Sequence, residues 1–191
     1  MSRVGILGGS FDPPHNAHLA MAQTALGRIP LDEILLMPAP HPPLKDSGEV
    51  TPYADRLEMV RLAIGDCEGL RLSRMEESGP GPSYTVELLR RYRRRFEDEP
   101  FLIVGSDSVC DLARWKDPQE ILSLATLVVF ARTGFPPRVP VPGEAAVVLF
   151  EAPVIDVSSS DIRARLRAGL PVRSFLPDAV LDFVLDKRLY T

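Results

Sequence analysis

Residues 8–18 of this chain read Gly8-Gly9-Ser10-Phe11-Asp12-Pro13-Pro14-His15-Asn16-Ala17-His18, and this stretch decides the fold. It follows the apolar run Val4-Gly5-Ile6-Leu7 and leads into Leu19-Ala20-Met21-Ala22, the order of a strand, a glycine turn and a helix. Free N–H groups and the dipole of a helix N-terminus favour an anion. Because His15 and His18 lie at this end, the stretch predicts a phosphate site and favours a nucleotide-handling enzyme.

Length and composition narrow the class of protein. At 191 residues the chain is expected to form one domain, residues 1–191, with a core of its own. The hydrophobic share of 45% and the charged share of 25% are those of an ordinary soluble protein. A net charge of −4 argues against a general nucleic-acid surface, so no nucleic-acid partner is expected.

Cysteine usage and hydropathy predict the compartment. Cys67 and Cys110 are too few and too far apart for a disulfide framework or a zinc site. No apolar run approaches the ~20 residues of a membrane span. The first residues also lack the pattern of a signal peptide. We therefore expect a cytoplasmic protein without a membrane partner.

Apolar runs alternate with helical patterns along the rest of the chain. Strands are predicted at Arg3–Leu7, Glu33–Met37, Leu70–Ser73, Phe101–Val104, Leu127–Ala131 and Ala146–Phe150. Helices are predicted at Asn16–Gly27, from a Thr51-Pro52 cap to Ile64, from a Ser83 cap to Phe96, at Pro118–Leu124, at Ser159–Ala168 and at Pro177–Leu189. Repeated βα units imply an α/β fold with a Rossmann-like, doubly wound parallel sheet.

Four segments follow predicted strands and are therefore expected to meet at the carboxyl edge of the sheet. They are the Gly8–His18 stretch, the proline-rich loop that ends in Lys45, Gly105-Ser106-Asp107 with the following Trp115-Lys116, and the segment Asp156–Arg163. In the last segment, three serines precede a helix and Arg163 lies about one turn inside it. Two such helix N-termini can clamp a triphosphate. The GxxxxGK[ST] and GxGxxG signatures are absent, which argues against a P-loop NTPase and a dehydrogenase.

Several of these segments resemble a known family. Residues 8–18 resemble the GG(T/S)FDPxHxGH signature of bacterial nicotinate-nucleotide adenylyltransferases, and residues 157–163 resemble their ISSTxIR signature. Between them, Ser83-Tyr84-Thr85 and residues 105–116 match the family's SYT and GxDxxxxLxxWK stretches. The resemblance runs from Val4 to the C-terminal Leu-Tyr. It implies the nucleotidyltransferase type of fold, with ATP and nicotinate mononucleotide as partners, and deamido-NAD and pyrophosphate as products.

The resemblance also implies roles for the matched residues. The implied catalytic residues are His18, His15, Arg163 and Lys45, with His18 foremost. The implied ATP-binding residues are Gly8, Gly9, Ser10, Phe11, His15, His18, Gly105, Asp107, Ser159, Ser160 and Arg163. The implied nicotinate-mononucleotide-binding residues are Ser10, Phe11, Lys45, Tyr84, Thr85, Trp115 and Lys116. Mg²⁺ is expected on phosphates and waters, without a side-chain metal cage. The sequence is also compatible with a homo-oligomer.

Some positions also have an ordinary structural interpretation. Leu44 replaces a histidine that is common in the family, which removes one contact from that loop. Asp107 is also a candidate cap for the next helix, Trp115 a candidate core residue, and His41 a candidate surface residue. The basic run 90–95 is interpreted as a solvated helix face balanced by the acidic residues 97–99.

Three other functions compete with adenylyl transfer to nicotinate mononucleotide. The first is a sister transferase that uses nicotinamide mononucleotide or phosphopantetheine, although Thr85 and Trp115 argue against the latter. The second is a sensor that binds ATP without turnover. The third is an aminoacyl-tRNA synthetase, which the short chain and the absence of a KMSKS-like run argue against.

Overall fold

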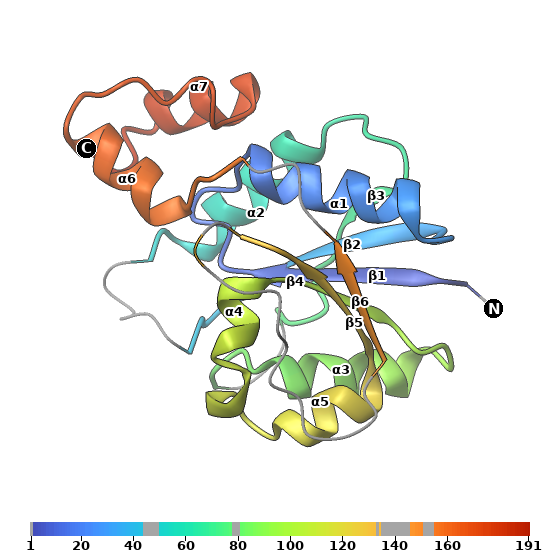
Figure 1. Cartoon of the computed structure of the whole chain (residues 1–191). Helices are drawn as coiled ribbons and strands as arrows, with labels where there is room; N and C mark the ends of the chain where they lie inside the picture. The colour runs from blue at the N-terminus through green and yellow to red at the C-terminus, as the bar shows by residue number, and fades with distance from the viewer. Residues whose placement is uncertain (1, 44–49, 78–80, 133, 135–145, 151–154) are drawn as a thin grey trace.

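A single parallel sheet organises the molecule (Figure 1). The computed structural model describes residues 2–43, 50–77, 81–132, 134, 146–150 and 155–191. The strands are β1 (Val4–Gly9), β2 (Glu33–Pro38), β3 (Leu70–Leu72), β4 (Phe101–Gly105), β5 (Thr126–Phe130) and β6 (Val147–Phe150). They lie in the order β3-β2-β1-β4-β5-β6, and every pair is parallel. The order reverses between β1 and β4, which is where such sheets open a crevice for a ligand.

Helices cover both faces of the sheet (Figure 1). One face carries α1 (Asn16–Arg28) and α2 (Tyr53–Ile64). The other carries α3 (Thr85–Arg95), α4 (Ser106–Cys110), the 3₁₀ turn η1 (Leu112–Arg114) and α5 (Pro118–Leu124). The last two helices, α6 (Ser159–Arg167) and α7 (Asp178–Asp186), pack on the outer side of α2. The predicted doubly wound α/β fold is confirmed.

Each helical layer has its own apolar core against the sheet. Ile6, Leu102 and Val129 contact the layer of α3 to α5, whereas Ile34 and Val128 face α1 and α2. This alternation follows from the period of two along a strand that is buried on both sides. A third cluster joins α2 to α6 and α7.

A glycine makes the centre of the sheet possible. Gly5 in β1 lies so close to β2 that an added Cβ would come within 2.8 Å of the Ile34 side chain. A larger residue would have to displace the Ile34 side chain, so the packing favours glycine at this position in the first strand.

Two helix starts differ from the sequence predictions. The N-cap of α2 is Pro52, not Thr51, and α3 begins at Thr85 with Tyr84 as its N-cap, not Ser83. The Ser83 hydroxyl instead accepts the N–H of His41 at 3.1 Å, and the His41 carbonyl accepts the N–H of Ser83 at 2.8 Å. Ser83 therefore ties the loop after β2 to the start of α3.

Other boundaries differ by a few residues. The two short helical pieces α4 and η1 were not predicted, because neither is long enough to show a helical period. Ser158 lies before α6, whereas Ser159 and Ser160 form its first turn. The final helix ends at Asp186 instead of Leu189. Among the described residues, no helix combines the length and the apolar character needed to cross a membrane.

Candidate active site

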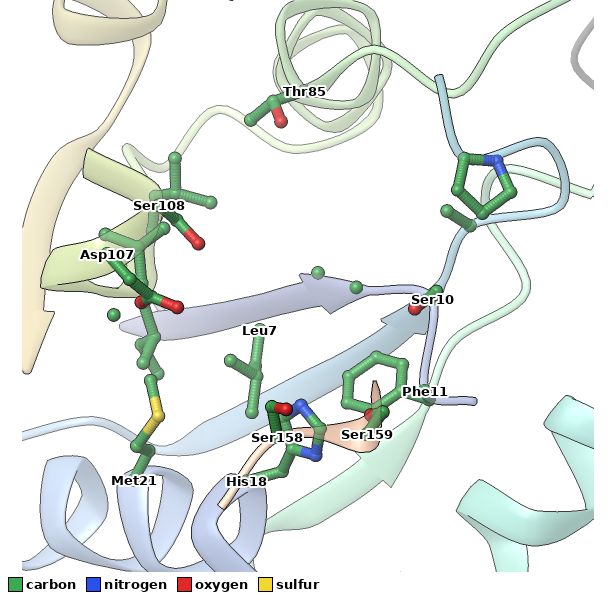
Figure 2. Close-up of a pocket in the computed structure, with 18 of the residues that line it drawn as sticks. Leu7, Ser10, Phe11, His18, Met21, Thr85, Asp107, Ser108, Ser158 and Ser159 are labelled. Carbon is green, nitrogen blue, oxygen red and sulfur yellow. The ribbon is translucent and has the colours of Figure 1, made fainter. Parts of the chain in front are cut away.

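A cleft of about 910 Å³ opens where the strand order reverses. Figure 2 shows side chains from distant segments around this cleft, with His18 and Ser159 near one end and Thr85 across from them. The sequence-predicted residues that line it are Gly8, Gly9, Ser10, Phe11, His15, His18, Tyr84, Thr85, Gly105, Asp107, Trp115, Lys116, Ser159 and Ser160. Arg163 is not among the residues that line the cleft, but its guanidinium binds the carbonyl of Asp12 in the turn between β1 and α1. Lys45 and Leu44 lie outside the described residues.

The two histidines of the first signature are stacked on each other. Their ring centroids are 3.7 Å apart with an interplanar angle of 27°. The backbone N–H of His15 donates to Nδ1 of His18 at 3.2 Å, while the Phe11 ring lies 4.9 Å from the His18 ring. Because Nδ1 of His18 accepts this bond, a neutral His18 carries its proton on Nε2, which is a suitable donor to a phosphate oxygen.

His15 has an unusually low pKa. Its side chain is only 5% exposed, and burial together with the nearby Arg132 guanidinium lowers the pKa of His15 to about 4. At neutral pH His15 is therefore uncharged, and it can act in the cleft as a polar group but not as a cation.

The second signature contacts the first directly. Ser159 donates its hydroxyl hydrogen to the Pro13 carbonyl at 2.9 Å, and Arg163 donates to the Asp12 carbonyl at 2.8 Å. The helix that carries them begins with a capping box, in which Ser158 and Asp161 each accept the other's backbone N–H at 3.1 Å. Two signatures about 145 residues apart thus form one surface at paired helix N-termini.

An ion pair that the sequence analysis missed lies beside them. Arg132 follows β5 and donates to the Asp107 carboxylate at 2.8 Å and to the Val157 carbonyl at 2.9 Å. Asp107 lies inside α4, whose N-cap is Gly105, so Asp107 is not the cap of that helix. Arg132 adds a positive charge to the cleft. The rule that ligand-facing residues follow strand ends would have found it, had it been applied to β5.

The far end of the cleft contains an ion pair between α3 and the segment that precedes α5. Lys116 donates to Glu87 at 2.9 Å, which raises the pKa of Lys116, and its ammonium lies 5.1 Å from the Tyr84 ring centroid. Trp115 is half-buried and packs on the core while it also lines the cleft, so both interpretations of this residue hold in part.

The basic run pairs differently from the prediction. Arg90 binds Glu87, Asp117 and Glu120, so its partners are acids of α3 and of the start of α5 instead of residues 97–99. Residues 93–95 are exposed, as a solvated helix face should be. His41 is exposed as well.

Glu76 is a further residue that sequence reasoning missed. Its side chain is 9% exposed and lines the cleft, and burial raises the pKa of its carboxyl to about 7, against a smaller opposing effect of Arg91. Glu76 and Glu77 are adjacent after a short strand, and nothing in the local sequence indicates that the first of them is buried. Among the residues that the structure describes, no three His, Cys, Asp or Glu side chains are grouped as metal ligands.

Comparisons with known proteins agree with this geometry. The family model described as cytidylyltransferase-like matches residues 6–165. A protein from Thermus thermophilus that bears the name of a probable nicotinate-nucleotide adenylyltransferase is 41% identical, covering 98% of this chain and 99% of its own. One of the same name from Bacillus licheniformis is 37% identical, covering 100% and 99%.

A solved structure shares the fold. The nicotinic acid mononucleotide adenylyltransferase of Plasmodium falciparum, complexed with NaAD, superimposes with a TM-score of 0.86 at 20% identity and covers 100% of this chain and 98% of its own. The match of the family model over most of the chain, together with full-length relatives well above 30% identity, decides the family. The chain belongs to the cytidylyltransferase-like family, among the nicotinate-nucleotide adenylyltransferases.

Proposed function

We propose that the protein transfers the adenylyl group of ATP to nicotinate mononucleotide and releases deamido-NAD and pyrophosphate. The observation that carries this function is the joined pair of helix N-termini, where His18 and Ser159 line one cleft and Arg163 binds the turn between them. Relatives that match this chain over nearly their whole length bear the name of this enzyme, which supports the proposal.

The reaction needs alignment more than acid–base chemistry. The phosphate of nicotinate mononucleotide attacks the α-phosphorus of ATP in line, the new P–O bond forms, and the bond to the leaving pyrophosphate breaks. A phosphate monoester with a second pKa near ~6 is already mostly dianionic at neutral pH, so no general base is required. The protein's part is to hold the reactants in line and to stabilise the developing charge.

The phosphate end of the cleft supplies donors for that charge. We assign Nε2–H of His18 and the guanidinium of Arg163 to the ATP phosphates, with the free N–H groups at the start of α6 beside them. The neutral His15 supports His18 through their stacked rings and the bond to Nδ1. Lys45 remains a proposed phosphate ligand.

The opposite end of the cleft suits the pyridine ring. Thr85 is the first residue of α3, so its N–H has no acceptor within the helix and is available to a carboxylate. Trp115 also lines the cleft, and the Lys116 side chain is held by Glu87. We assign the nicotinate carboxylate to the backbone N–H groups of Thr85 and Lys116, which would favour the acid over the amide.

A divalent metal belongs to this chemistry, because nucleotidyltransferases of this kind generally use one. We propose Mg²⁺, carried by the ATP phosphates and waters, which it prefers to a cage of side chains. When bound it neutralises phosphate charge. Arg132 lines the cleft and Arg163 binds the turn beside it, so two guanidinium groups lie near the proposed phosphates. We further propose that residues 1–191 act as one domain in the cytoplasm, with nucleotides as partners.

Release of pyrophosphate from ATP and Mg²⁺ tests the function, with nicotinate mononucleotide compared against nicotinamide mononucleotide. We expect release with the acid and little with the amide. Equal release with both would overturn the pyridine-end assignment and keep the transferase. No release with either would overturn the function.

His18→Ala separates the enzyme from an ATP sensor. We expect turnover to fall by about 10²-fold or more, because a donor to the transition state is lost, while ATP binding measured by calorimetry persists. Unchanged turnover would contradict the role given to His18.

A further inference from the structure

The catalytic turn is anchored to the end of the chain. Asp12, at the centre of the first signature, is fully buried, and its Oδ1 accepts the hydroxyl hydrogen of Tyr190 at 2.7 Å. Tyr190 lies 178 positions away in the sequence and is the last residue but one. A buried carboxylate requires donors, so this bond has a structural reason.

The same aspartate also contacts Arg163. Its carbonyl accepts the Arg163 guanidinium at 2.8 Å, whereas its other carboxylate oxygen, Oδ2, lies 3.9 Å from the same nitrogen. Among the described residues, Oδ2 has no hydrogen-bond partner. The guanidinium therefore lies between two competing sites, the backbone carbonyl that it binds and the carboxylate beside it.

The other polar groups of the turn have separate anchors. The buried Arg56 donates to the carbonyl of Ser10 at 2.7 Å, and the backbone N–H of Asn16 donates to the Phe175 carbonyl at 2.8 Å. Loss of the Tyr190 hydroxyl would consequently change the surroundings of the Asp12 carboxylate and leave the rest of the turn in place.

Two features of Tyr190 bear on its role as a hydrogen-bond donor to Asp12. Tyr190 adopts a φ of 65°, a backbone conformation that is costly for a tyrosine. Burial and the Asp12 carboxylate raise the pKa of Tyr190 well above its ordinary value, so the phenol keeps its proton throughout the working range.

We propose that Tyr190 is a positioning residue of the active site. Its hydroxyl binds Oδ1 of Asp12, which weakens the attraction of that carboxylate for Arg163 and so keeps Arg163 on the backbone carbonyl, near the phosphates of ATP. Without that hydroxyl, Asp12 has one donor fewer and draws the Arg163 guanidinium toward Oδ2. This inference rests on the proposed function, because it assumes that Arg163 binds phosphate.

A double-mutant cycle tests the proposal on the full chain. The variants are Tyr190→Phe, Arg163→Ala and the double variant, with Tyr92→Phe as the matched control. Tyr92 is a buried core tyrosine whose hydroxyl has no partner among the described residues. For each variant, kcat and KM are measured for both substrates at a temperature well below its melting temperature.

We expect Tyr190→Phe to lower kcat about tenfold and to leave the KM for nicotinate mononucleotide within about twofold. Tyr92→Phe should keep the wild-type kcat. In the Arg163→Ala background, Tyr190→Phe should lower kcat no further, because the residue through which it acts is gone. A purely structural role would lower the melting temperature and leave kcat unchanged.

Two results would overturn the proposal. One is a wild-type kcat for Tyr190→Phe, and the other is a further tenfold loss in the double variant. If Tyr190→Phe does not fold, Asp12→Asn tests the same contact, because it removes the carboxylate charge that competes for Arg163. The proposal then predicts a kcat within about twofold of wild type, and a tenfold loss would overturn it. A wild-type protein that releases no pyrophosphate would instead refute the proposed function itself.

Discussion

Burial beside the cleft decides which single residues carry charge. The pKa of His15 is lowered to about 4 and that of Glu76 is raised to about 7, and desolvation is the main cause in both cases. Both shifts favour the neutral form. Arg132 lines the cleft and Arg163 binds the turn beside it, so two guanidinium groups lie near this end of the cleft in an overall acidic protein.

Glu76→Gln gives a prediction on pH and stability. Between pH 4.5 and about 7 the folded protein retains the Glu76 proton and the unfolded chain releases it, so wild-type stability falls as the pH rises through this window. The variant lacks this loss. We expect it to match wild type below pH 4.5 and to exceed it by up to about 3 kcal/mol above pH 7.

Urea unfolding at pH 4 and pH 8 measures this difference. Glu77→Gln is the matched control, because that neighbour is exposed and paired with Arg74. It should show a change of less than about 0.5 kcal/mol at either pH. A Glu76→Gln effect of the same size at both pH values would contradict the role of titration.

At the scale of elements, the start of α6 joins stability to the site. Ser158→Ala removes the capping hydroxyl and should cost about 1 kcal/mol of unfolding free energy. Ser159 and Arg163 in the same helix bind carbonyl groups of the turn between β1 and α1. Loss of the cap should therefore raise the KM for ATP as well. Thermal melting and initial rates measure the two effects.

Ser123→Ala is the control for this prediction. Ser123 lies in α5, and its hydroxyl bonds a carbonyl three residues earlier on an exposed surface. It should change stability by less than about 0.5 kcal/mol and leave the KM for ATP unaltered. If Ser158→Ala changes stability and the KM for ATP as little as Ser123→Ala does, the N-cap of α6 does not position the site.

At the scale of the whole molecule, Met59 marks the joint between the sheet layers and the last two helices. It is fully buried in the cluster shared by α2, α6 and α7. Met59→Ala should lower the unfolding free energy by about 2–5 kcal/mol, because a cavity opens there. Leu185→Ala, at a residue that is 54% exposed, should change it by less than about 0.5 kcal/mol. Urea unfolding measures both changes. Equal losses of unfolding free energy for Met59→Ala and Leu185→Ala would contradict this role of Met59.

The sequence by itself determined the parallel α/β sheet and the order of its elements. Each strand is a short apolar run. The turn at Gly8–His18 is specified by residues that are close together in the sequence. The carboxyl-end rule then placed both signatures at one edge, and the structure lines one cleft with most of the residues so predicted.

Only the tertiary structure decided the partners of the charged side chains. Glu76 is buried, Arg132 pairs with Asp107, and Tyr190 bonds Asp12, yet none of these facts has a local pattern in the sequence. Burial and pairing depend on which distant segments approach within a few ångströms, and a one-dimensional pattern reports periodicity but not distance. For the same reason Ser83 did not cap α3, since its hydroxyl was taken by the loop at His41, 42 residues away.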